Sequence, residues 1–188
     1  TVLDSLRTGS EKTVKEHRKH PEYTFQKKDL RNLEEIVPLF EGMDFVFHAA
    51  ANADIRGGSK DTRVDLENNT LATYNVLEAM RLHDVKGIAF TSSSAVYGEP
   101  TQIPTPEDYP AVQTSLYGAS KLAGESLIQA FSYYYGMRYS IYRLVSVLGA
   151  RYPHGVVIDL FHKLRKNAKE LEILGNGKEV FAKFKNIL

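Results

Sequence analysis

Short apolar runs alternate with longer segments of helical periodicity along most of this chain, and this alternation constrains the fold more than any other feature of the sequence. Two of the runs, 43–50 (MDFVFHAA) and 86–94 (KGIAFTSSS), are apolar at successive positions, as expected for strands buried on both faces. Between them, residues 69–85 place apolar side chains at helical spacing. A helix that connects two such strands is typical of a parallel sheet covered by helices on both faces, so we predict an α/β fold.

The rest of the chain continues this alternation. Further strands are predicted at 1–3, 23–30, 138–149 and 171–174, and further helices at 30–40, 120–136 and 156–167. Ligands of such folds bind beyond the carboxyl ends of the strands. Polar and small side chains follow several of the predicted strands: Asp4, Asp29, His48 to Ala51 and Thr91 to Ser94. These strand ends are therefore the predicted place of a cofactor.

The composition argues against several classes of function. The 24 Lys and Arg residues nearly balance the 23 Asp and Glu residues, so a net charge of +1 gives no reason to expect nucleic acid or an acidic membrane as a partner. No apolar run approaches the roughly 20 residues that span a membrane. The chain has no Cys, and His17 and His20 lack further ligands for a metal. We expect a cytoplasmic protein without a bound metal.

The stretch 115–126 (SLYGASKLAGES) contains Tyr117 and Lys121 at a spacing that places both on one face of a helix. A lysine ammonium beside a phenol favours the phenolate and lowers its pKa from about 10, which makes the tyrosine a usable general base. Hydroxyls in 91–98 (TSSSAVYG) could hold the reacting oxygen of a substrate. Taken alone, the pair has a plainer interpretation, in which Tyr117 packs and Lys121 points to solvent.

Other segments accompany this pair in a fixed order: VLDSLRTG (2–9), KKDLRN (27–32), VFHAAANADIR (46–56), ENNTLATYNVLEAM (67–80), TSSSAVYG (91–98), YRLVSVLGARYPHGVV (142–157) and LEILGNGK (171–178). Together they resemble the extended short-chain dehydrogenase/reductases, in particular the nucleotide-sugar epimerases typified by UDP-glucose 4-epimerase. The resemblance covers the chain from its first residue to about Lys178.

The resemblance implies a Rossmann-like, doubly wound parallel sheet. In that family a Gly-x-Gly-x-x-Gly turn lies just before the point where this chain begins, and the motif does not occur in this sequence. We therefore expect a chain that lacks the first strand and helix of the fold and most of the substrate lobe. Residues 1–150 would form an NAD-binding domain, incomplete at its N-terminus, and residues 151–188 the start of an incomplete substrate-binding region.

The resemblance also assigns contacts with NAD: Asp4, Asp29, Leu30, Ala49, Ala50, Ala51, Asn69, Tyr117 and Lys121. It implies that Asp4 binds the adenosine ribose hydroxyls and that Asp29 and Leu30 lie near the adenine. A carboxylate accepts hydrogen bonds from a free ribose hydroxyl and repels a 2′-phosphate, so Asp4 favours NAD over NADP, although the nearby Arg7 weakens this preference.

For the reaction, the resemblance makes Tyr117 the base and has Lys121 lower its pKa and bond the nicotinamide ribose. Ser93 would hydrogen-bond the sugar oxygen that is oxidised. Because Ser92 and Ser94 are its neighbours, this role could belong to a serine one position away. Substrate contacts are assigned to Ser93, Tyr117 and Ser146. Ser146 stands where many epimerases carry Asn, which weakens assignment to any particular sugar.

The implied function is NAD-dependent epimerisation of a nucleotide sugar at C4 through a 4-keto intermediate, of the UDP-glucose/UDP-galactose type. Nucleotide-sugar dehydratases carry an acidic pair where this chain has Ser94 and Ala95, which argues against dehydration. The alternatives are another enzyme of this family (a dehydratase, decarboxylase or reductase) or a non-catalytic Rossmann fragment. A homodimer through the Tyr117 helix and the helix before it is implied, although packing on the sheet would also explain the apolar faces of these helices.

Overall fold

The computed structural model describes residues 1–55, 57–149 and 155–173. The chain divides into two compact units, which are considered separately: Thr1–Pro100 with Asp108–Arg143, and Thr101–Glu107 with Leu144–Leu188. The predicted functional boundary at residue 150 stays a prediction.

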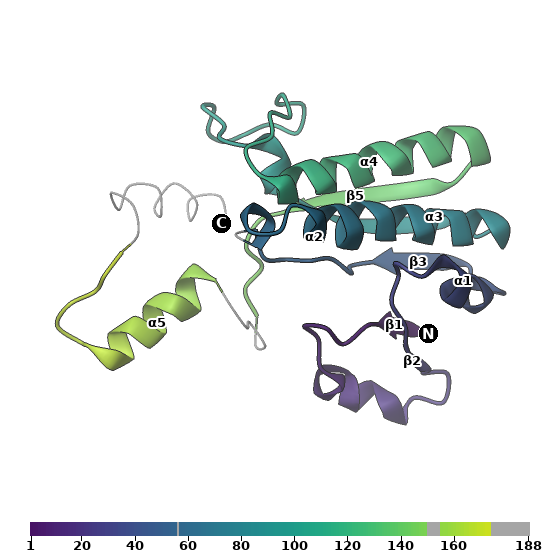
Figure 1. Ribbon diagram of the computed structural model, residues 1–188, viewed down its shortest axis with the longest axis horizontal. Helices are drawn as coiled ribbons and strands as arrows, with labels where there is room; N and C mark the ends of the chain where they lie inside the picture. Colours follow the sequence, from purple (N-terminus) through teal and green to yellow (C-terminus); the bar gives the residue numbers. More distant parts are fainter. Residues whose placement is uncertain (56, 150–154, 174–188) are drawn as a thin grey trace. The chain divides into compact units, whose positions relative to one another are not determined.

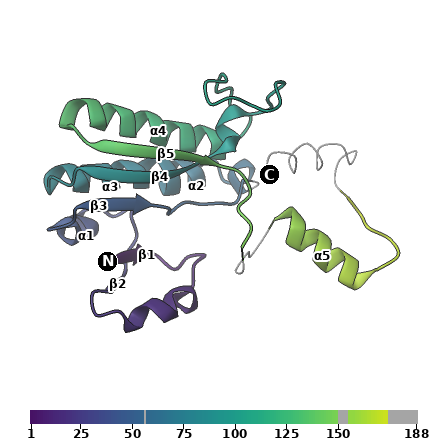
Figure 2. The same ribbon diagram turned by 180° about the vertical axis from the view of Figure 1, so that it is seen from behind.

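The strands of the first unit form two sheets (Figures 1 and 2). β1 (Val2–Asp4) and β2 (Phe25–Lys27) pair in parallel, and β3 (Phe45–His48), β4 (Gly87–Ser93) and β5 (Arg138–Leu144) form a three-stranded sheet in that order. β3 and β4 are parallel, with Phe45 opposite Gly87. The Rossmann-like parallel α/β class is confirmed, although the strands of the described part do not join into one sheet.

The helices and turns of this unit lie between the strands in sequence: η1 (Glu11–Lys19), α1 (Leu33–Ile36), η2 (Val37–Phe40), η3 (Gly57–Ser59), α2 (Arg63–Asp65), η4 (Leu66–Leu71), α3 (Ala72–Leu82), η5 (Ser94–Tyr97) and α4 (Leu116–Tyr135). α2, η4 and α3 follow one another directly, and η4 is a π-helical turn. The predicted helix at 69–85 therefore begins earlier, at 63. The predicted helix at 120–136 begins at Leu116, where Ser115 accepts a hydrogen bond from the N–H of Gly118 and caps the helix.

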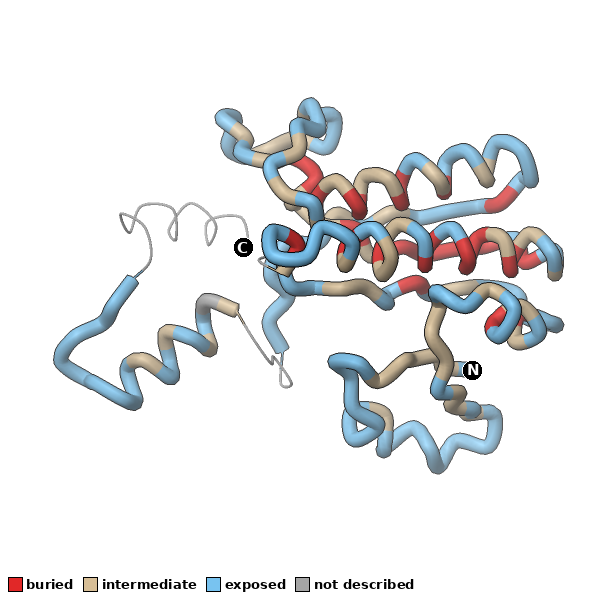
Figure 3. Tube along the Cα trace, in the orientation of Figure 1, coloured by how far each residue is buried: buried red, intermediate tan, exposed pale blue. Residues whose placement is uncertain are grey.

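The core lies where α3 and α4 pack on the three-stranded sheet, and Figure 3 shows the buried positions along this contact. The side chains at its centre are at most 1% exposed: Leu77, Met80, Ile88, Phe90 and Ile128. Gly124 brings α4 close to the sheet, because a Cβ there would lie 3.0 Å from the ring of Phe90. The close contact at Gly124 therefore sets the distance between α4 and β4. Removing a buried apolar side chain from such a core typically costs about 2–5 kcal/mol of stability.

The second face of the sheet is open at β3. Val46 and His48 are directed to the helices, whereas Phe45 and Phe47 on the alternate positions are 46% and 83% exposed. The sequence predicts helices over both faces, and within the first unit they cover only one (Figures 1 and 2).

In the second unit, the helix predicted at 156–167 is present as α5 (Val156–Lys166). The strand predicted at 171–174 is not formed at 171–173, and residue 174 lies outside the described residues. Among the helices that the structure describes, none combines the length and apolar character needed to cross a lipid bilayer.

Candidate active site

Tyr117 and Ser93 meet at the end of β4. The phenol of Tyr117, in the first turn of α4, lies near the side chain of Ser93, which acts to lower the pKa of the phenol. The Ser93 oxygen also accepts a hydrogen bond from the N–H of Ala95 at 3.2 Å. Gly118 permits this approach, because a Cβ there would lie 2.7 Å from the carbonyl oxygen of Ala95. Two of the three predicted catalytic residues thus lie near each other.

The pKa of Tyr117 is raised above its ordinary value of 10.0. The largest cause is burial, which removes hydration from the phenolate. The Ser93 side chain acts in the opposite direction, and the negative charge of Asp65 raises the pKa further. The site therefore favours the neutral phenol.

Lys121, one helical turn after Tyr117, is 2% exposed. Its Nζ donates to the carbonyl oxygen of Thr91 at 2.8 Å and lies 4.9 Å from the centre of the Phe90 ring. Burial lowers the pKa of Lys121 to about 8. In this structure the ammonium is directed to β4, so the predicted lowering of the Tyr117 pKa by Lys121 stays a prediction.

His48, at the end of β3, is buried and neutral. Burial and then the charge of Lys121 lower its pKa to about 3. Its Nε2 lies 2.9 Å from Oγ1 of Thr73, whose own proton goes to the carbonyl oxygen of Asn69 at 2.6 Å. Nε2 must therefore carry the proton, and His48 packs at the strand end, as its position in the sequence suggests.

An ion pair behind the site was not predicted. Arg143, on β5, binds the carboxylate of Glu125, on α4, with Nη2 to Oε2 at 2.8 Å. Ser92 donates a hydrogen bond to the same carboxylate. The Arg143 guanidinium also lies 4.8 Å from the centre of the Tyr97 ring. Glu125 lies four residues after Lys121 on the apolar side of the helix, and a carboxylate at such a position is the one sequence signal that could have indicated this pair.

Asp4 is the last residue of β1, and its side chain is held by the turn that follows. Its Oδ1 accepts a hydrogen bond from the N–H of Leu6 at 2.6 Å, and Gly9 approaches so closely that a Cβ there would lie 2.9 Å from Oδ2. Nearby, Nη1 of Arg7 donates to Oδ1 of Asn68 at 2.5 Å, which connects this turn to η4.

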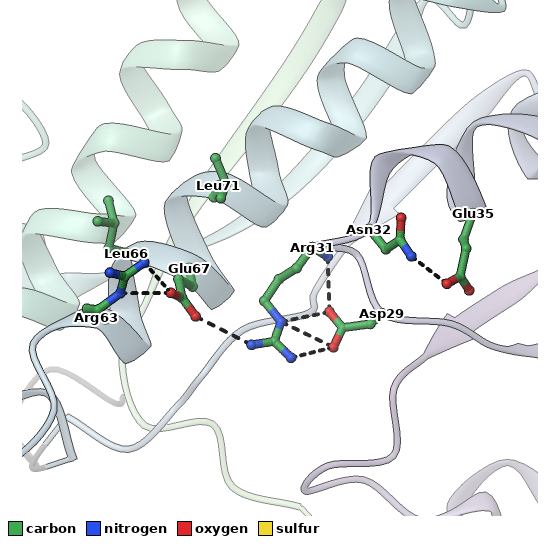
Figure 4. A pocket seen from close by; sticks show the side chains of 8 residues that line it. All are labelled: Asp29, Arg31, Asn32, Glu35, Arg63, Leu66, Glu67 and Leu71. Atoms are coloured by element: carbon green, nitrogen blue, oxygen red, sulfur yellow. Dashed lines mark hydrogen bonds and ion pairs between the residues drawn. The ribbon is translucent and has the colours of Figure 1, made fainter.

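A pocket of about 600 Å³ lies beside the end of β2 (Figure 4). Its lining combines charged and apolar side chains: Asp29, Arg31, Asn32, Glu35, Arg63, Leu66, Glu67 and Leu71. Arg31 bridges Asp29 at 2.7 Å and Glu67 at 3.5 Å across it. The hydrogen bond with Arg31 lowers the pKa of Asp29, so this carboxylate is ionised. Leu30 contributes its carbonyl oxygen to Asn75 at 2.8 Å and packs against the core.

A family model described as the NAD dependent epimerase/dehydratase family matches residues 1–181. The chain belongs to this family. Among curated relatives, it is 35% identical over 185 residues to a putative UDP-glucose 4-epimerase of Methanocaldococcus jannaschii, covering 95% of this chain and 58% of the relative. It is 36% identical over 163 residues to a UDP-glucose 4-epimerase of Lacticaseibacillus casei, covering 86% of this chain and 47% of the relative. The chain thus spans about half the length of these relatives.

Solved structures give the same result. A crystal structure of UDP-galactose 4-epimerase matches with a TM-score of 0.80 and 37% identity, covering 90% of this chain and 55% of that chain. The UDP-glucose 4-epimerase of Thermus thermophilus, solved as a complex with NAD, matches with a TM-score of 0.76 and 33% identity, covering 86% and 53%. The epimerase/dehydratase chain therefore shares the fold of enzymes that bind NAD.

The residues at the strand ends of this epimerase/dehydratase chain fit NAD. Asp4 presents a fixed carboxylate at the end of β1, which suits a ribose hydroxyl, and the small residues Ala49, Ala50 and Ala51 leave the end of β3 open to a flat ligand. The pocket in Figure 4 adds the apolar side chains of Leu66 and Leu71 at the position expected for an adenine. These contacts remain predictions.

Asn69 has a different environment from the one expected of a cofactor contact. It is 2% exposed, and its amide joins protein groups: Oδ1 accepts from the N–H of Asn52 at 2.7 Å, and Nδ2 donates to Oγ of Ser120 at 2.9 Å. Ser146 is exposed and belongs to the second unit, so its predicted substrate contact stays a prediction.

Proposed function

We propose that this protein catalyses the NAD-dependent epimerisation of a UDP-linked sugar at C4, through a 4-keto intermediate of the UDP-glucose/UDP-galactose type. The observation that carries the proposal is the approach of Tyr117 to Ser93 at the end of β4, with Lys121 buried one turn further along α4. Curated relatives at 35% and 36% identity are UDP-glucose 4-epimerases, which supports the choice of reaction.

Tyr117 and Ser93 can hold one substrate oxygen between them. A sugar hydroxyl placed between the two side chains would be within reach of both, so that Ser93 orients the oxygen and Tyr117 accepts its proton. Bound NAD supplies the redox chemistry. Because burial raises the pKa of Tyr117, its action as a base needs a nearby positive charge, and Lys121 is the ammonium on the same helical face.

Dehydration of a nucleotide sugar is the second candidate. A dTDP-glucose 4,6-dehydratase of Streptomyces venezuelae matches this chain with a TM-score of 0.84 at 26% identity, so the fold does not separate the two reactions. The side chains after β4 favour epimerisation. Elimination of water needs an acid and a base beside Tyr117, and Ser94 and Ala95 supply no carboxylate there.

We also propose that the protein forms a homodimer through the outer sides of α3 and α4. Large apolar side chains are exposed there: Leu82 at 51%, Tyr133 at 85% and Tyr134 at 75%. Tyr74 and Phe131 bridge α3 and α4 with an edge-on ring contact of 6.2 Å, so both helices contribute to this side of the molecule. Light scattering on the purified protein would test the dimer, and a monomer at micromolar concentration would contradict it.

The reaction is tested by incubating the purified protein and NAD with UDP-, dTDP- and GDP-sugars and identifying products by NMR. We expect C4 epimers of a UDP-sugar, lost in Tyr117→Phe and retained in Tyr139→Phe, which alters an exposed tyrosine of β5. Formation of a 4-keto-6-deoxy sugar would establish the dehydratase instead. Unchanged epimerisation by Tyr117→Phe would remove the assigned base.

A further inference from the structure

Asp65 is a buried carboxylate whose surroundings require an explanation. It is 1% exposed. Its Oδ1 accepts hydrogen bonds from Nδ2 of Asn52 at 2.9 Å and Nδ2 of Asn69 at 3.3 Å, whereas its Oδ2 is buried without a hydrogen-bond partner. Gly58 lies against that oxygen, and a Cβ at Gly58 would be 2.3 Å from it. Burial of a carboxylate with so few donors is costly, and such a group usually has a functional reason.

A chain of hydrogen bonds leads from Asp65 to the residue that carries the reaction. Asn69, held by Asp65, donates through Nδ2 to Oγ of Ser120 at 2.9 Å. Ser120 in turn donates to the carbonyl oxygen of Tyr117 at 2.7 Å. The same Asn69 amide accepts from the N–H of Asn52, in the segment after β3. Three segments that are distant in sequence are therefore joined at the first turn of α4.

The helix that carries Asp65 and Asn69 is irregular at this place. Asp65 ends α2, and Asn69 lies in the π-helical turn η4. π turns are rare in helices and occur frequently at functional sites. The wide turn thus begins directly after Asp65 and contains Asn69, the side chain that contacts α4, which is an independent indication that their placement matters.

We propose that Asp65 is a positioning residue for Tyr117. Through Asn69 and Ser120 it fixes the turn of α4 that carries the phenol, and its charge acts on that phenol from α2. The proposal deepens the proposed function and rests on it only for the role of Tyr117 in the reaction.

The electrostatics agree with this geometry. After burial and the Ser93 side chain, the charge of Asp65 is the remaining influence on Tyr117, and it raises the pKa of the phenol. Other titratable side chains on α4 and on the elements packed against it have contacts of their own: Arg63, Glu67, Tyr74, Glu78, Arg81, Tyr97, Lys121 and Glu125. Removal of the Asp65 charge should therefore lower the pKa of Tyr117.

Asp65→Asn separates charge from hydrogen bonding. The amide keeps the size of the side chain and the Oδ1 acceptor for Asn52 and Asn69, and it removes the charge. The pKa of Tyr117 is measured by NMR titration of protein labelled with ¹³C at the tyrosine ring, and Tyr117→Phe identifies the resonance. We expect the pKa of Tyr117 to fall in Asp65→Asn, because a nearby negative charge disfavours the phenolate. Asp84→Asn, at a carboxylate whose side chain is 82% exposed, is the control and should leave the titration unchanged.

The hydrogen-bond chain is tested with Ser120→Ala. This variant removes the link to the Tyr117 carbonyl oxygen and leaves Asp65 in place. We expect kcat to fall about tenfold with little change in KM, because displacement of the base weakens stabilisation of the transition state more than it weakens substrate binding. Asp65→Asn should keep most of kcat and move the pH profile of kcat to lower pH.

An unchanged Tyr117 titration in a folded Asp65→Asn protein would overturn the proposal, and so would an unchanged kcat in Ser120→Ala. The titration requires no turnover. A shifted pKa in a protein without epimerase activity would therefore support the positioning role of Asp65 while contradicting the proposed reaction, so the two failures are distinguishable.

Discussion

Arg143 and Glu125 form an ion pair between β5 and α4, with Nη2 and Oε2 2.8 Å apart and their side chains 26% and 3% exposed. The guanidinium binds both carboxylate oxygens, since Nε also lies 3.1 Å from Oε1. The pair therefore joins the helix that carries Tyr117 to the strand beside β4. Ser92, immediately before Ser93, donates to the same carboxylate.

Loss of this carboxylate should destabilise the fold. Glu125→Ala leaves the partly buried Arg143 without its counter-ion and Ser92 without its acceptor, and breaking a buried pair in this way typically costs about 3–5 kcal/mol. The free energy of unfolding, measured by urea denaturation, should fall accordingly. Asp84→Asn, at a surface pair with Lys86, should change it by less than about 0.5 kcal/mol. Equal effects of the two substitutions on the free energy of unfolding would show that the Glu125–Arg143 pair does not stabilise the fold.

Tyr117→Phe should separate catalysis from cofactor binding. Removal of a general acid–base typically costs about 10² to 10⁴ in kcat, whereas the aromatic ring and its packing are retained. We expect turnover to fall by that amount while the affinity for NAD, measured by calorimetry, stays within about threefold. A comparable loss of NAD affinity would mean that the phenol serves chiefly to bind the cofactor.

The strands and helices that frame the site followed from periodicity alone. The runs at 43–50 and 86–94 contain β3 and β4, and the stretch 115–126 lies at the start of α4. Periodicity reports which face of an element is apolar, and this sufficed to place the elements, whereas the pairing of Ser93 with Tyr117 followed from the family resemblance.

The polar contacts between elements could not be predicted in the same way. Glu125 and Arg143 are 18 residues apart, and Ser92 and Glu125 are 33 apart, so their meeting depends on the register of α4 against the sheet. The direction of the Lys121 ammonium also depends on tertiary packing. Helical spacing places Lys121 on the same face as Tyr117 but does not determine its hydrogen-bond partner. The carbonyl oxygen of Thr91 is that partner.

Asp4 should determine the choice of cofactor. A carboxylate held at the end of β1 accepts from a ribose hydroxyl and repels a 2′-phosphate, and Arg7 is engaged with Asn68 in this structure. Asp4→Ser should weaken NAD binding about tenfold and narrow the preference for NAD over NADP. Calorimetric titration with both cofactors measures the change, and Asp44→Ser, at an exposed residue before β3, is the control. An unchanged ratio of the two affinities would exclude Asp4 from the ribose site.

Lys121 should limit stability at neutral pH. Its pKa in the folded protein, about 8, lies below the ordinary value of 10.5, because burial disfavours the ammonium. Between these two values the unfolded chain binds the proton and the folded chain does not, so the contribution of Lys121 to the free energy of unfolding rises with pH across this window. Below pH 8 the charged, buried side chain costs up to about 3 kcal/mol.

Lys121→Met should therefore raise the free energy of unfolding at pH 7 by about 1–3 kcal/mol, less than the full cost because the hydrogen bond to Thr91 is lost. The difference between the variant and the wild-type protein should shrink as the pH rises from 8 to 10.5, because the wild-type lysine then no longer carries a buried charge. Urea denaturation of both proteins at pH 7, 8.5 and 10 measures this. Lys86→Met, at an exposed lysine, should show no such pH dependence. A constant difference between Lys121→Met and wild type over this range would mean that the Lys121 pKa is not lowered by burial.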